Sequence, residues 1–357
     1  MALKDKILLS GNEAIAKGAL DAGCRFYAGY PITPQNELIA YMARNMKEAG
    51  GVFIQSESEL AAINMVFGAS ATGTRAMTSS SSPGISLMQE GISYIAGAEL
   101  PAVIANIMRA GPGLGNIWPA QSDYFQATKG GGHGDYHCIV LAPSTVQEAY
   151  GLTALAFDLA DKYKCPVIIL SDGMLGQMME PLRVKGKGLR VKDFAKPWAL
   201  TGCEGRKPNV AKSFYLKLGE LEKFNLKLQE KYKTINKKEQ RYEKFHLDKA
   251  DIILVAYGTM ARLAKQAMLD LREKGVKAGL IRPVSLWPFP NGVFKNLAHT
   301  KKRLKFLCLE MSCGQMVEDV RLALNGRADV EFLGRAGGGV LIVEEIVNKA
   351  RMLTRKH

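Results

Sequence analysis

The chain has 357 residues, of which 47% are hydrophobic and 23% are charged, so a wholly disordered or fibrous protein is excluded. This length leaves room for two domains, each with its own core. The first residues lack the apolar run of a signal peptide. The longest apolar stretch, 94–108, is interrupted by Glu99 and Pro101 and is too short to cross a bilayer. We therefore expect a soluble cytoplasmic protein with no membrane partner.

The formal net charge of +14 is concentrated in one part of the chain. Residues 183–250 contain 19 Lys or Arg against 8 Asp or Glu, a net of +11. This segment lacks aromatic-glycine RNA-binding patterns and recognisable DNA-reading motifs, so we do not expect a nucleic-acid partner. Two interpretations stay open. The segment is either a solvated, partly helical connector or a docking surface for an acidic partner, such as a small ferredoxin or a sister subunit.

Residues 7–180 alternate short apolar strands with helical stretches, which is the βαβ pattern of a parallel sheet covered on both faces. Ser10 and Glu13 form a capping box that starts a helix ending near Gly23. The sequence predicts strands at 24–30, 52–55, 74–78, 102–108, 138–142 and 166–171. It predicts helices between them, from 34 towards 50 and at 59–72 and 144–163.

The alternation of strands and helices stops between 183 and 249. There we expect a loop followed by one long amphipathic helix or a helical hairpin. The alternation returns after Asp251, with strands at 252–257, 278–281, 304–310 and 330–332 and helices around 260–274, 314–325 and 341–353. The sequence therefore predicts an α/β protein in three parts: a first α/β domain over 1–182, a basic connector over 183–249, and a smaller α/β domain over 250–357.

The six cysteines do not indicate a metal site. No two have C-x-x-C spacing, so neither a zinc ribbon nor a ferredoxin-type cluster is predicted on this chain. Four of them lie inside apolar stretches, where we expect buried, reduced thiols: Cys24, Cys138, Cys165 and Cys308.

Ligands of parallel α/β sheets bind beyond the carboxyl ends of the strands, and the turn from Tyr30 to Pro34 follows such an end. Its structural interpretation is a helix start, with Thr33 as the N-cap and Pro34 in the first helical position. The functional interpretation is compatible with this one, because a capping hydroxyl at a strand end can also face a ligand.

The segment QSESE, residues 55–59, precedes an almost wholly apolar helical stretch that ends at Gly68. Ser56 and Glu59 fit a capping box, which would explain Glu59 by local structure. An apolar helix is, however, expected to be buried. A carboxylate at its start would then cost several kcal/mol unless a partner, such as a ligand nitrogen, compensates for lost hydration.

Arg109 follows the strand expected at 102–108 and precedes a glycine-rich loop. An arginine in this position can bind a carboxylate through two parallel hydrogen bonds, although an ordinary surface arginine is the alternative. Two further features are open to both interpretations. His133, in a run of glycines, is a base or an incidental loop histidine. The segment Ala336-Gly-Gly-Gly339 forms a phosphate-binding turn or a common strand–helix junction.

Together and in this order, these segments resemble the α-type subunit of 2-oxoacid:ferredoxin oxidoreductases. The resemblance is carried by YPITPQNEL, by QSESELAAINMVFGASATGTRAMTSSSSPGISLMQEGI, and by MRAGPGLGN with QSDYFQATKGGGHGDY. It covers residues 7–180 closely and 251–357 more loosely, and it does not cover the connector. It implies a thiamine-diphosphate-binding, pyrimidine-type parallel-sheet domain followed by a transketolase-C-terminal-like α/β domain.

The resemblance also implies a role for Glu59, which stands nine residues before Gly68. In thiamine enzymes a glutamate with this spacing bonds the aminopyrimidine ring and favours the tautomer that acts as an internal base. Glu57 stands eleven residues before Gly68 and is the second choice. The resemblance also implies that Pro31 and Ile32 lie in the cofactor site.

By the same resemblance, Thr33 would hydrogen-bond the 2-oxoacid and Arg109 would pair with its carboxylate. Diphosphate anchoring in this superfamily needs Gly-Asp-Gly and a later Asn that holds Mg²⁺. The single Asp-Gly, at Asp172, has no preceding Gly, and we assign it to structure. The diphosphate site, Mg²⁺ and iron–sulfur clusters are therefore expected on partners: a diphosphate-binding β-type subunit and γ and ferredoxin-like subunits.

The implied activity is oxidative decarboxylation, in which a 2-oxoacid and coenzyme A give acyl-CoA and CO₂ with reduction of ferredoxin. The run from Arg109 to Asn116 looks closer to branched-chain (3-methyl-2-oxobutanoate) members than to 2-oxoglutarate members. The alternatives are a 2-oxoglutarate α subunit, an indolepyruvate oxidoreductase, a dehydrogenase component with a lipoyl acceptor, and a non-catalytic scaffold. The chain alone is expected to be inactive.

Overall fold

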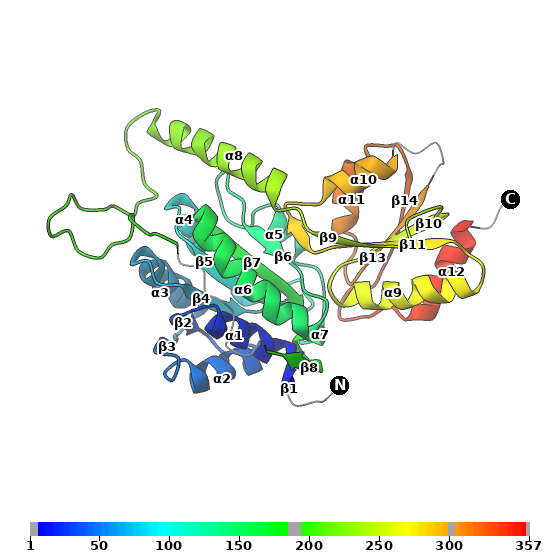
Figure 1. Ribbon diagram of the computed structural model, residues 1–357, viewed down its shortest axis with the longest axis horizontal. Helices are drawn as coiled ribbons and strands as arrows, with labels where there is room; N and C mark the ends of the chain where they lie inside the picture. Colours follow the sequence, from blue (N-terminus) through cyan, green and yellow to red (C-terminus); the bar gives the residue numbers. More distant parts are fainter. Residues whose placement is uncertain (1–5, 185–193, 299–303, 355–357) are drawn as a thin grey trace.

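The computed structural model describes residues 6–184, 194–298 and 304–354, and in Figure 1 these form two α/β bodies side by side. The first body contains a seven-stranded sheet with the order β12-β6-β7-β5-β4-β2-β3. Its strands are β2 (Phe26–Gly29), β3 (Val52–Gln55), β4 (Ala76–Ser80), β5 (Ala102–Met108), β6 (Ile139–Leu141), β7 (Pro166–Asp172) and β12 (Ser285–Trp287). The first six run parallel, and β12 pairs antiparallel with β6.

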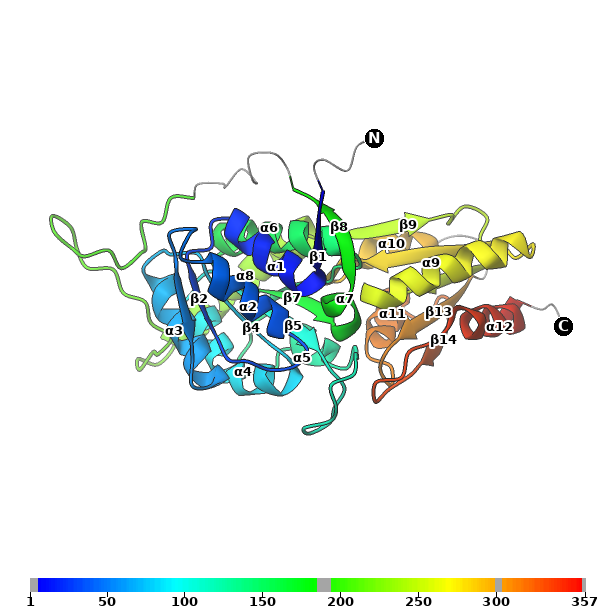
Figure 2. The same ribbon diagram turned by 90° about the horizontal axis from the view of Figure 1, so that it is seen from below.

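Every residue of β5 and of β7 is buried, as expected for central parallel strands covered on both faces. Helices α1 and α6 lie on one side of the sheet and α4 lies on the other (Figure 2). Helix α2 packs on α1, and α3 packs on α4. These helices are α1 (Gly11–Asp21), α2 (Asn36–Asn45), α3 (Glu59–Ala71), α4 (Ser82–Gly97) and α6 (Val146–Tyr163).

The predicted capping box at the start of α1 is confirmed. The Ser10 hydroxyl accepts a hydrogen bond from the Glu13 N–H at 3.1 Å, and the Glu13 carboxylate accepts one from the Ser10 N–H at 3.0 Å. Ser10 ends β1 (Lys6–Ser10), which pairs antiparallel with β8 (Met179–Arg183) in a two-stranded sheet. The short helices α5 (Tyr124–Thr128) and α7 (Gly173–Gln177) complete the first body.

Within its described residues, the basic connector contains one long helix rather than a hairpin, α8 (Glu220–Lys238). Leu228, Tyr232 and Ile235 on one face of α8 are buried against the first body. Residues 194–219 precede the helix, and part of this segment extends away from the body in Figure 1. The connector region also contains a strand that the sequence did not predict, β9 (Tyr242–Phe245), which joins the second sheet.

The second body contains a five-stranded sheet with the order β14-β13-β10-β11-β9. Strands β10 (Ile252–Val255), β11 (Ala278–Pro283), β13 (Lys305–Glu310) and β14 (Asp329–Gly334) are parallel, and β9 is antiparallel to β11. Its helices are α9 (Gly258–Glu273), α10 (Asn291–Ala298), α11 (Met316–Leu324) and α12 (Val343–Thr354). The chain between β11 and α10 returns to the first body, where it supplies β12.

Asp172 joins the two bodies, which agrees with its assignment to structure. Its side chain is buried and accepts hydrogen bonds from the Thr259 hydroxyl at 2.7 Å, the Thr259 N–H at 3.1 Å and the Leu175 N–H at 3.0 Å. Burial raises the pKa of this carboxyl group, and the three hydrogen bonds oppose that rise. Asp172 therefore caps α7 and fixes the start of α9.

The four cysteines expected in apolar stretches are buried and free, whereas Cys203 and Cys313 are exposed. Burial raises the pKa of the Cys24 thiol to about 12, so this group stays protonated at neutral pH. Within the described ranges, no helix combines the length and apolar character needed to cross a bilayer.

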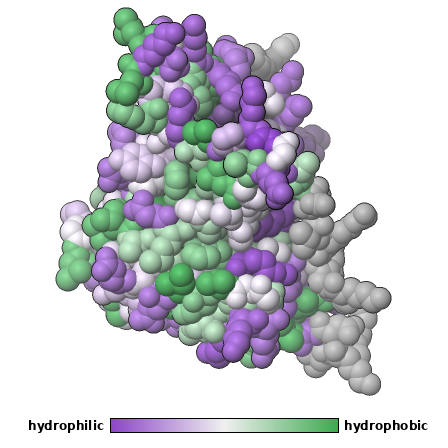
Figure 3. Space-filling view, turned by 90° about the vertical axis from the view of Figure 1, so that its left-hand side faces the viewer, coloured by the Kyte–Doolittle hydropathy of each residue, from purple (hydrophilic) through white to green (hydrophobic). Residues whose placement is uncertain are grey.

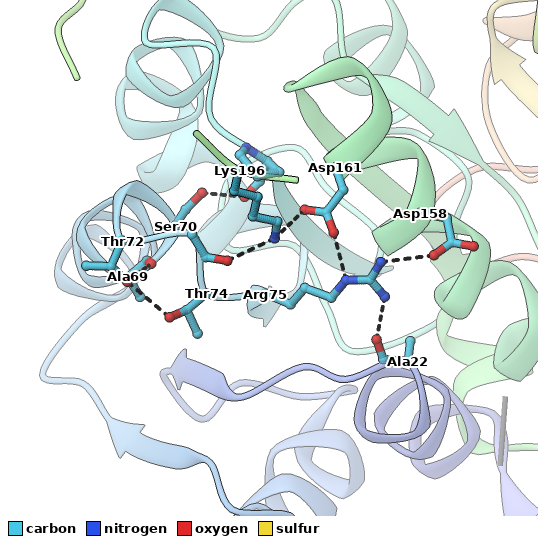
Figure 4. Close-up of polar contacts among 11 residues, drawn as sticks. Ala22, Ala69, Ser70, Thr72, Thr74, Arg75, Asp158, Asp161 and Lys196 are labelled. Carbon is cyan, nitrogen blue, oxygen red and sulfur yellow. Dashed lines mark hydrogen bonds and ion pairs between the residues drawn. The ribbon is translucent and has the colours of Figure 1, made fainter. Parts of the chain in front are cut away.

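A buried ionic network holds the connector against the first body (Figure 4). The Arg75 guanidinium contacts Asp161 at 2.8 Å and Asp158 at 3.0 Å. Lys196, from the connector, reaches the second oxygen of Asp161 at 2.7 Å and also donates to the Gly73 carbonyl at 2.9 Å. Asp161 is thus shared between two cations and is itself almost fully buried.

Replacing Asp161 by Ala should lower the free energy of unfolding by about 3 kcal/mol, because two poorly hydrated cations lose a shared carboxylate. Urea unfolding followed by circular dichroism measures this change. The matched control is Glu230→Ala, which breaks a surface pair with Lys233 whose side chains are 70% and 72% exposed and should change little. Equal losses in the two variants would contradict the role given to Asp161.

Candidate active site

The candidate residues lie at the carboxyl ends of four neighbouring strands. Thr33 follows β2, Glu59 follows β3, Ser80 ends β4 and Arg109 follows β5. These strands are adjacent in the order β5-β4-β2-β3. After β2 the chain turns towards β3, whereas after β4 it turns the other way, towards β5. This is a topological switch point, where open α/β sheets bind their ligands.

Glu59 is the first residue of α3 and is only 5% exposed. The predicted capping box of Ser56 and Glu59 is wrong. The N-cap is Ser58, whose hydroxyl accepts from the Ala61 N–H at 3.2 Å, while the Ser56 N–H donates to the Gly29 carbonyl and extends the pairing of β3 with β2. Glu59 therefore has no capping role, and its carboxylate lies at the positive end of the α3 dipole.

Little space surrounds one oxygen of the Glu59 carboxylate. The Ser80 hydroxyl donates to Oε1 at 3.3 Å, and a Cβ on Gly84 would lie 2.3 Å from Oε1 and 2.0 Å from the Ser80 Oγ. Only glycine fits at position 84. Within the described chain, Glu59 has no other hydrogen-bond partner, although a carboxylate can accept about four. A nearly buried carboxylate with this spare capacity fits a ligand that brings N–H groups or a ring nitrogen, as an aminopyrimidine does.

Arg109 is 6% exposed, and its guanidinium is held by carbonyl groups. It donates to the Thr33 carbonyl at 3.0 Å and to the Leu114 carbonyl at 3.2 Å. Its Nε is buried without a hydrogen-bond partner, and no carboxylate among the described residues pairs with it. Burying a guanidinium without a counter-ion costs free energy, and a ligand carboxylate would supply the missing negative charge.

Thr33 and Arg109 are brought together, but through the Thr33 carbonyl rather than its hydroxyl. The expected helix start at Pro34 is wrong, because residues 32–35 form a turn closed by the Gln35 N–H and the Ile32 carbonyl at 3.0 Å. Gln35 is the N-cap of α2, so Thr33 caps nothing, and its hydroxyl accepts only a 3.3 Å hydrogen bond from the Asn36 side chain.

The other candidates in these two segments differ in exposure. Pro31 is exposed, and Ile32 is half-buried. Glu57 is exposed, in contrast to Glu59, which is only two residues away. Glu57 therefore lacks the desolvated environment that a ligand-binding carboxylate would have at position 59.

Besides Ser80, three residues beside the candidate site were not predicted from the sequence: Ser82, Asn106 and Asp123. The Ser82 hydroxyl lies 3.0 Å from both the N and the O of Arg109 and 2.6 Å from Asp123 Oδ2. The same Asp123 oxygen accepts from the Asn106 amide at 2.9 Å. The available signals were the run of four serines at 79–82 and the acidic residue in QSDY, both inside otherwise apolar surroundings.

His133 does not lie at this site. Its carbonyl accepts from the Ser93 hydroxyl, and its ring packs edge-on against Tyr94. Ser93 is eleven residues along α4 from Ser82, about 16 Å at the usual helical rise. A cavity of about 830 Å³ lies near Asp135, between this loop and the start of α8, and it does not include Glu59 or Arg109.

The glycines at 337–339 do contact the loop that follows Arg109. The Asn116 amide donates to the Gly337 carbonyl at 3.0 Å, and a Cβ on Gly338 would lie 2.5 Å from the Trp118 Cβ. This turn therefore acts here as a close packing surface between the second body and the loop that follows Arg109. In the part of the chain that is described, no cluster of three or more His, Cys, Asp or Glu could hold a metal ion.

Residues 17–246 match a protein family described as pyruvate flavodoxin/ferredoxin oxidoreductase, thiamine diphosphate-binding, and residues 250–346 match pyruvate:ferredoxin oxidoreductase core domain II. The chain belongs to the 2-oxoacid:ferredoxin oxidoreductase family. This confirms the predicted family and the predicted α/β fold, with its thiamine-type and transketolase-like parts.

Relatives of this oxidoreductase subunit cover almost its whole length. It is 50% identical to the ketoisovalerate oxidoreductase subunit VorB of Methanothermobacter thermautotrophicus, over 96% of this chain and 97% of the relative. It is 36% identical to the 2-oxoglutarate synthase subunit KorA of Methanothermobacter marburgensis, over 97% and 99%.

Solved structures share the fold of the oxidoreductase subunit. The 2-oxoglutarate:ferredoxin oxidoreductase from Magnetococcus marinus, with 2-oxoglutarate, coenzyme A and succinyl-CoA bound, matches with a TM-score of 0.89 at 28% identity. The match covers 98% of this chain but 66% of that one. A split-gene transketolase matches over 97% and 99% with a TM-score of 0.59 at 14% identity, which supports the fold alone.

Proposed function

We propose that this subunit contributes half of the active site of an enzyme that oxidises a branched-chain 2-oxoacid. The products would be acyl-CoA, CO₂ and reduced ferredoxin, with 3-methyl-2-oxobutanoate as the favoured substrate. The observation that carries the reaction is a pair of nearly buried charges, Glu59 after β3 and Arg109 after β5, at the carboxyl end of one sheet. Among the described residues, neither of them has a counter-ion. The preference for a branched-chain acid is supported by 50% identity to the ketoisovalerate relative against 36% to the 2-oxoglutarate relative.

Glu59 would hold the aminopyrimidine of thiamine diphosphate through its spare acceptor capacity, with Pro31 and Ile32 beside the ring. When bound, the cofactor supplies a nucleophilic carbon for the keto group and accepts the electron pair released with CO₂. Ser80 and Gly84 keep the carboxylate of Glu59 in one position. A fixed, desolvated carboxylate exchanges a proton with a ring nitrogen more effectively than a hydrated one.

Arg109 would bind the substrate carboxylate, and Thr33 would hydrogen-bond the substrate from the turn after β2. The guanidinium already faces the Thr33 carbonyl, and its Nε is free to donate. Pairing with a carboxylate would supply the counter-charge that the described protein does not. Because Arg109 directly follows β5 and Thr33 lies in a hydrogen-bonded turn after β2, the keto carbon would be held at a set distance from the cofactor.

The diphosphate, Mg²⁺ and iron–sulfur clusters would be held by other subunits: a β-type subunit for the diphosphate and metal, and γ and ferredoxin-like subunits for electron transfer. This is supported by the absence of a Gly-Asp-Gly sequence from this chain. It is also supported by the surface around Glu59. Leu60, Met65 and Leu87, on α3 and α4, are exposed, and hydrophobic residues gather across the middle of the face shown in Figure 3. Apolar surface of this kind marks a protein interface.

The basic connector fits the same assembly. Residues 194–219 carry exposed apolar side chains at Val210, Phe214 and Leu216, interspersed with lysines. A basic, apolar segment of this kind suits an acidic protein partner, such as a sister subunit or ferredoxin. Coenzyme A would enter the assembled complex as acyl acceptor.

The test is co-expression with the partner subunits, purification of the complex, and measurement of CoA-dependent ferredoxin reduction. We expect kcat/KM for 3-methyl-2-oxobutanoate to exceed that for 2-oxoglutarate by at least about tenfold, since an apolar pocket discriminates against a second carboxylate through its desolvation. A reversed preference would replace the branched-chain proposal by the 2-oxoglutarate one. A complex without 2-oxoacid oxidation would overturn the function itself.

A further inference from the structure

Ser82 is the feature that joins the substrate-side arginine to the rest of the sheet. It is the first residue of α4, directly after the last strand residues of β4 and the cap Ser81. Its single hydroxyl lies 3.0 Å from the Arg109 N, 3.0 Å from the Arg109 O and 2.6 Å from Asp123 Oδ2. Both main-chain polar groups of Arg109 are therefore within reach of one side chain.

The distances assign the directions of these hydrogen bonds. A hydroxyl has one proton to donate and two lone pairs to accept. The Arg109 N–H can only donate, so Ser82 accepts from it. The Ser82 proton goes to the 2.6 Å contact with Asp123, because hydrogen bonds to a carboxylate are shorter and stronger than those to a carbonyl. Asp123 thus sets the orientation in which Ser82 can accept from Arg109.

Asp123 is itself tied to the same strand. It accepts from the Asn106 amide at 2.9 Å, and Asn106 lies on β5 three residues before Arg109. Among the described residues, both of its hydrogen-bond donors are neutral and no cation pairs with it. Burial raises its pKa, and the bonds from Ser82 and Asn106 oppose that rise. Burying a carboxylate without a cationic partner costs free energy. We therefore expect a functional role for Asp123.

The role of this carboxylate follows from the position of Arg109 at the junction of β5 and a glycine-rich loop. Arg109 directly follows β5, and glycines at 111, 113 and 115 follow it, the last two with left-handed backbones. The guanidinium is held only by carbonyls of two loops, at Thr33 and Leu114. Its direction therefore depends on the main chain at position 109, which Ser82 holds together with the bridge between Arg109 and Pro119.

We propose that Asp123, acting through Ser82, is a positioning residue that fixes Arg109 for recognition of the substrate carboxylate. This rests on the proposed function, in which Arg109 binds that carboxylate. The alternative is a purely structural link between α4, β5 and the loop before α5. The two differ in what they predict. A positioning role affects the affinity for the 2-oxoacid, whereas a structural link affects stability and all substrates alike.

The experiment compares Ser82→Ala and Asp123→Asn in the co-expressed complex. We expect the KM for the 2-oxoacid to rise about tenfold in both, with kcat within about threefold and the KM for coenzyme A unchanged, as for loss of uniform substrate binding. The matched control is Ser86→Ala, one turn further along α4, whose hydroxyl contacts Gln126 instead of Asp123. It should behave as the wild type.

Each outcome decides the proposal. Wild-type kinetics in Ser82→Ala would overturn it, as would parallel losses for the 2-oxoacid and coenzyme A or a lowered unfolding midpoint without a change in the KM for the 2-oxoacid. Asp123→Asn keeps the shape of the side chain and serves where Ser82→Ala does not assemble. A wild-type complex that does not oxidise 2-oxoacids would instead refute the proposed function, which separates the two failures.

Discussion

Glu59→Gln should reduce the turnover number of the assembled enzyme by at least about 100-fold while leaving the complex assembled. Loss of a positioned acid–base group typically costs this much. Glutamine has nearly the same shape as glutamate and can still accept from Ser80, so packing at the start of α3 should persist. It cannot carry the charge that favours the reactive tautomer of the pyrimidine. Ferredoxin reduction at saturating substrate, together with gel filtration of the complex, measures both expectations.

Glu57→Gln is the control for this prediction. It removes an identical charge two residues away, from a side chain that is exposed. A hydrated carboxylate outside the site should contribute little, so activity should stay close to that of the wild type. If the two variants exchanged behaviour, Glu57 would take over the role given to Glu59. If both kept full turnover, neither carboxylate would serve the cofactor.

Arg109→Ala should lower kcat/KM for the 2-oxoacid by at least about 100-fold, mostly through KM. Hydrogen bonds to charged groups contribute about 1.5–3 kcal/mol each, and two of them would be lost. Arg109→Lys should recover only part of this, because an ammonium cannot form the two parallel bonds of a guanidinium. Steady-state kinetics over a range of 2-oxoacid concentrations measure both effects.

Arg25→Ala is the matched control for Arg109. Arg25 also donates to main-chain carbonyls, those of Leu20 and Cys24. It directly precedes β2, however, and therefore lies at the amino ends of the parallel strands, opposite the candidate site. Its loss should leave kcat/KM unchanged. Recovery of full affinity by Arg109→Lys would show that only charge matters and would contradict the bidentate geometry.

The fold could be predicted for buried strands that their own sequence identifies. The ranges 52–55 and 102–108 coincide with β3 and β5, because an apolar run between turn residues leaves few alternatives. Strands β1, β8, β9 and β12 were not predicted. Strand β9 lies in a charged segment and β12 has three residues. All four exist through pairing with distant strands that no local pattern encodes.

The site was predictable only in part, for a related reason. Thr33, Glu59 and Arg109 could be placed at one end of the sheet because each follows a predicted strand and parallel strands bring their carboxyl ends together. Ser82 and Asp123 depend on contacts across 27 and 41 residues, which spacing cannot reveal. The capping box failed because QSESE offers two serines, and pairing of Ser56 with β2 leaves only the second one to cap α3.

Strand β12 has a consequence for anyone who wishes to divide this protein. It belongs by sequence to the C-terminal part, yet it pairs with β6 and forms the outer edge of the N-terminal sheet. A fragment ending near residue 250 would leave the backbone groups of β6 unpaired and exposed. Bare edges of this kind pair with other chains and aggregate. The two halves are therefore better studied as a bimolecular complementation pair than as independent truncations.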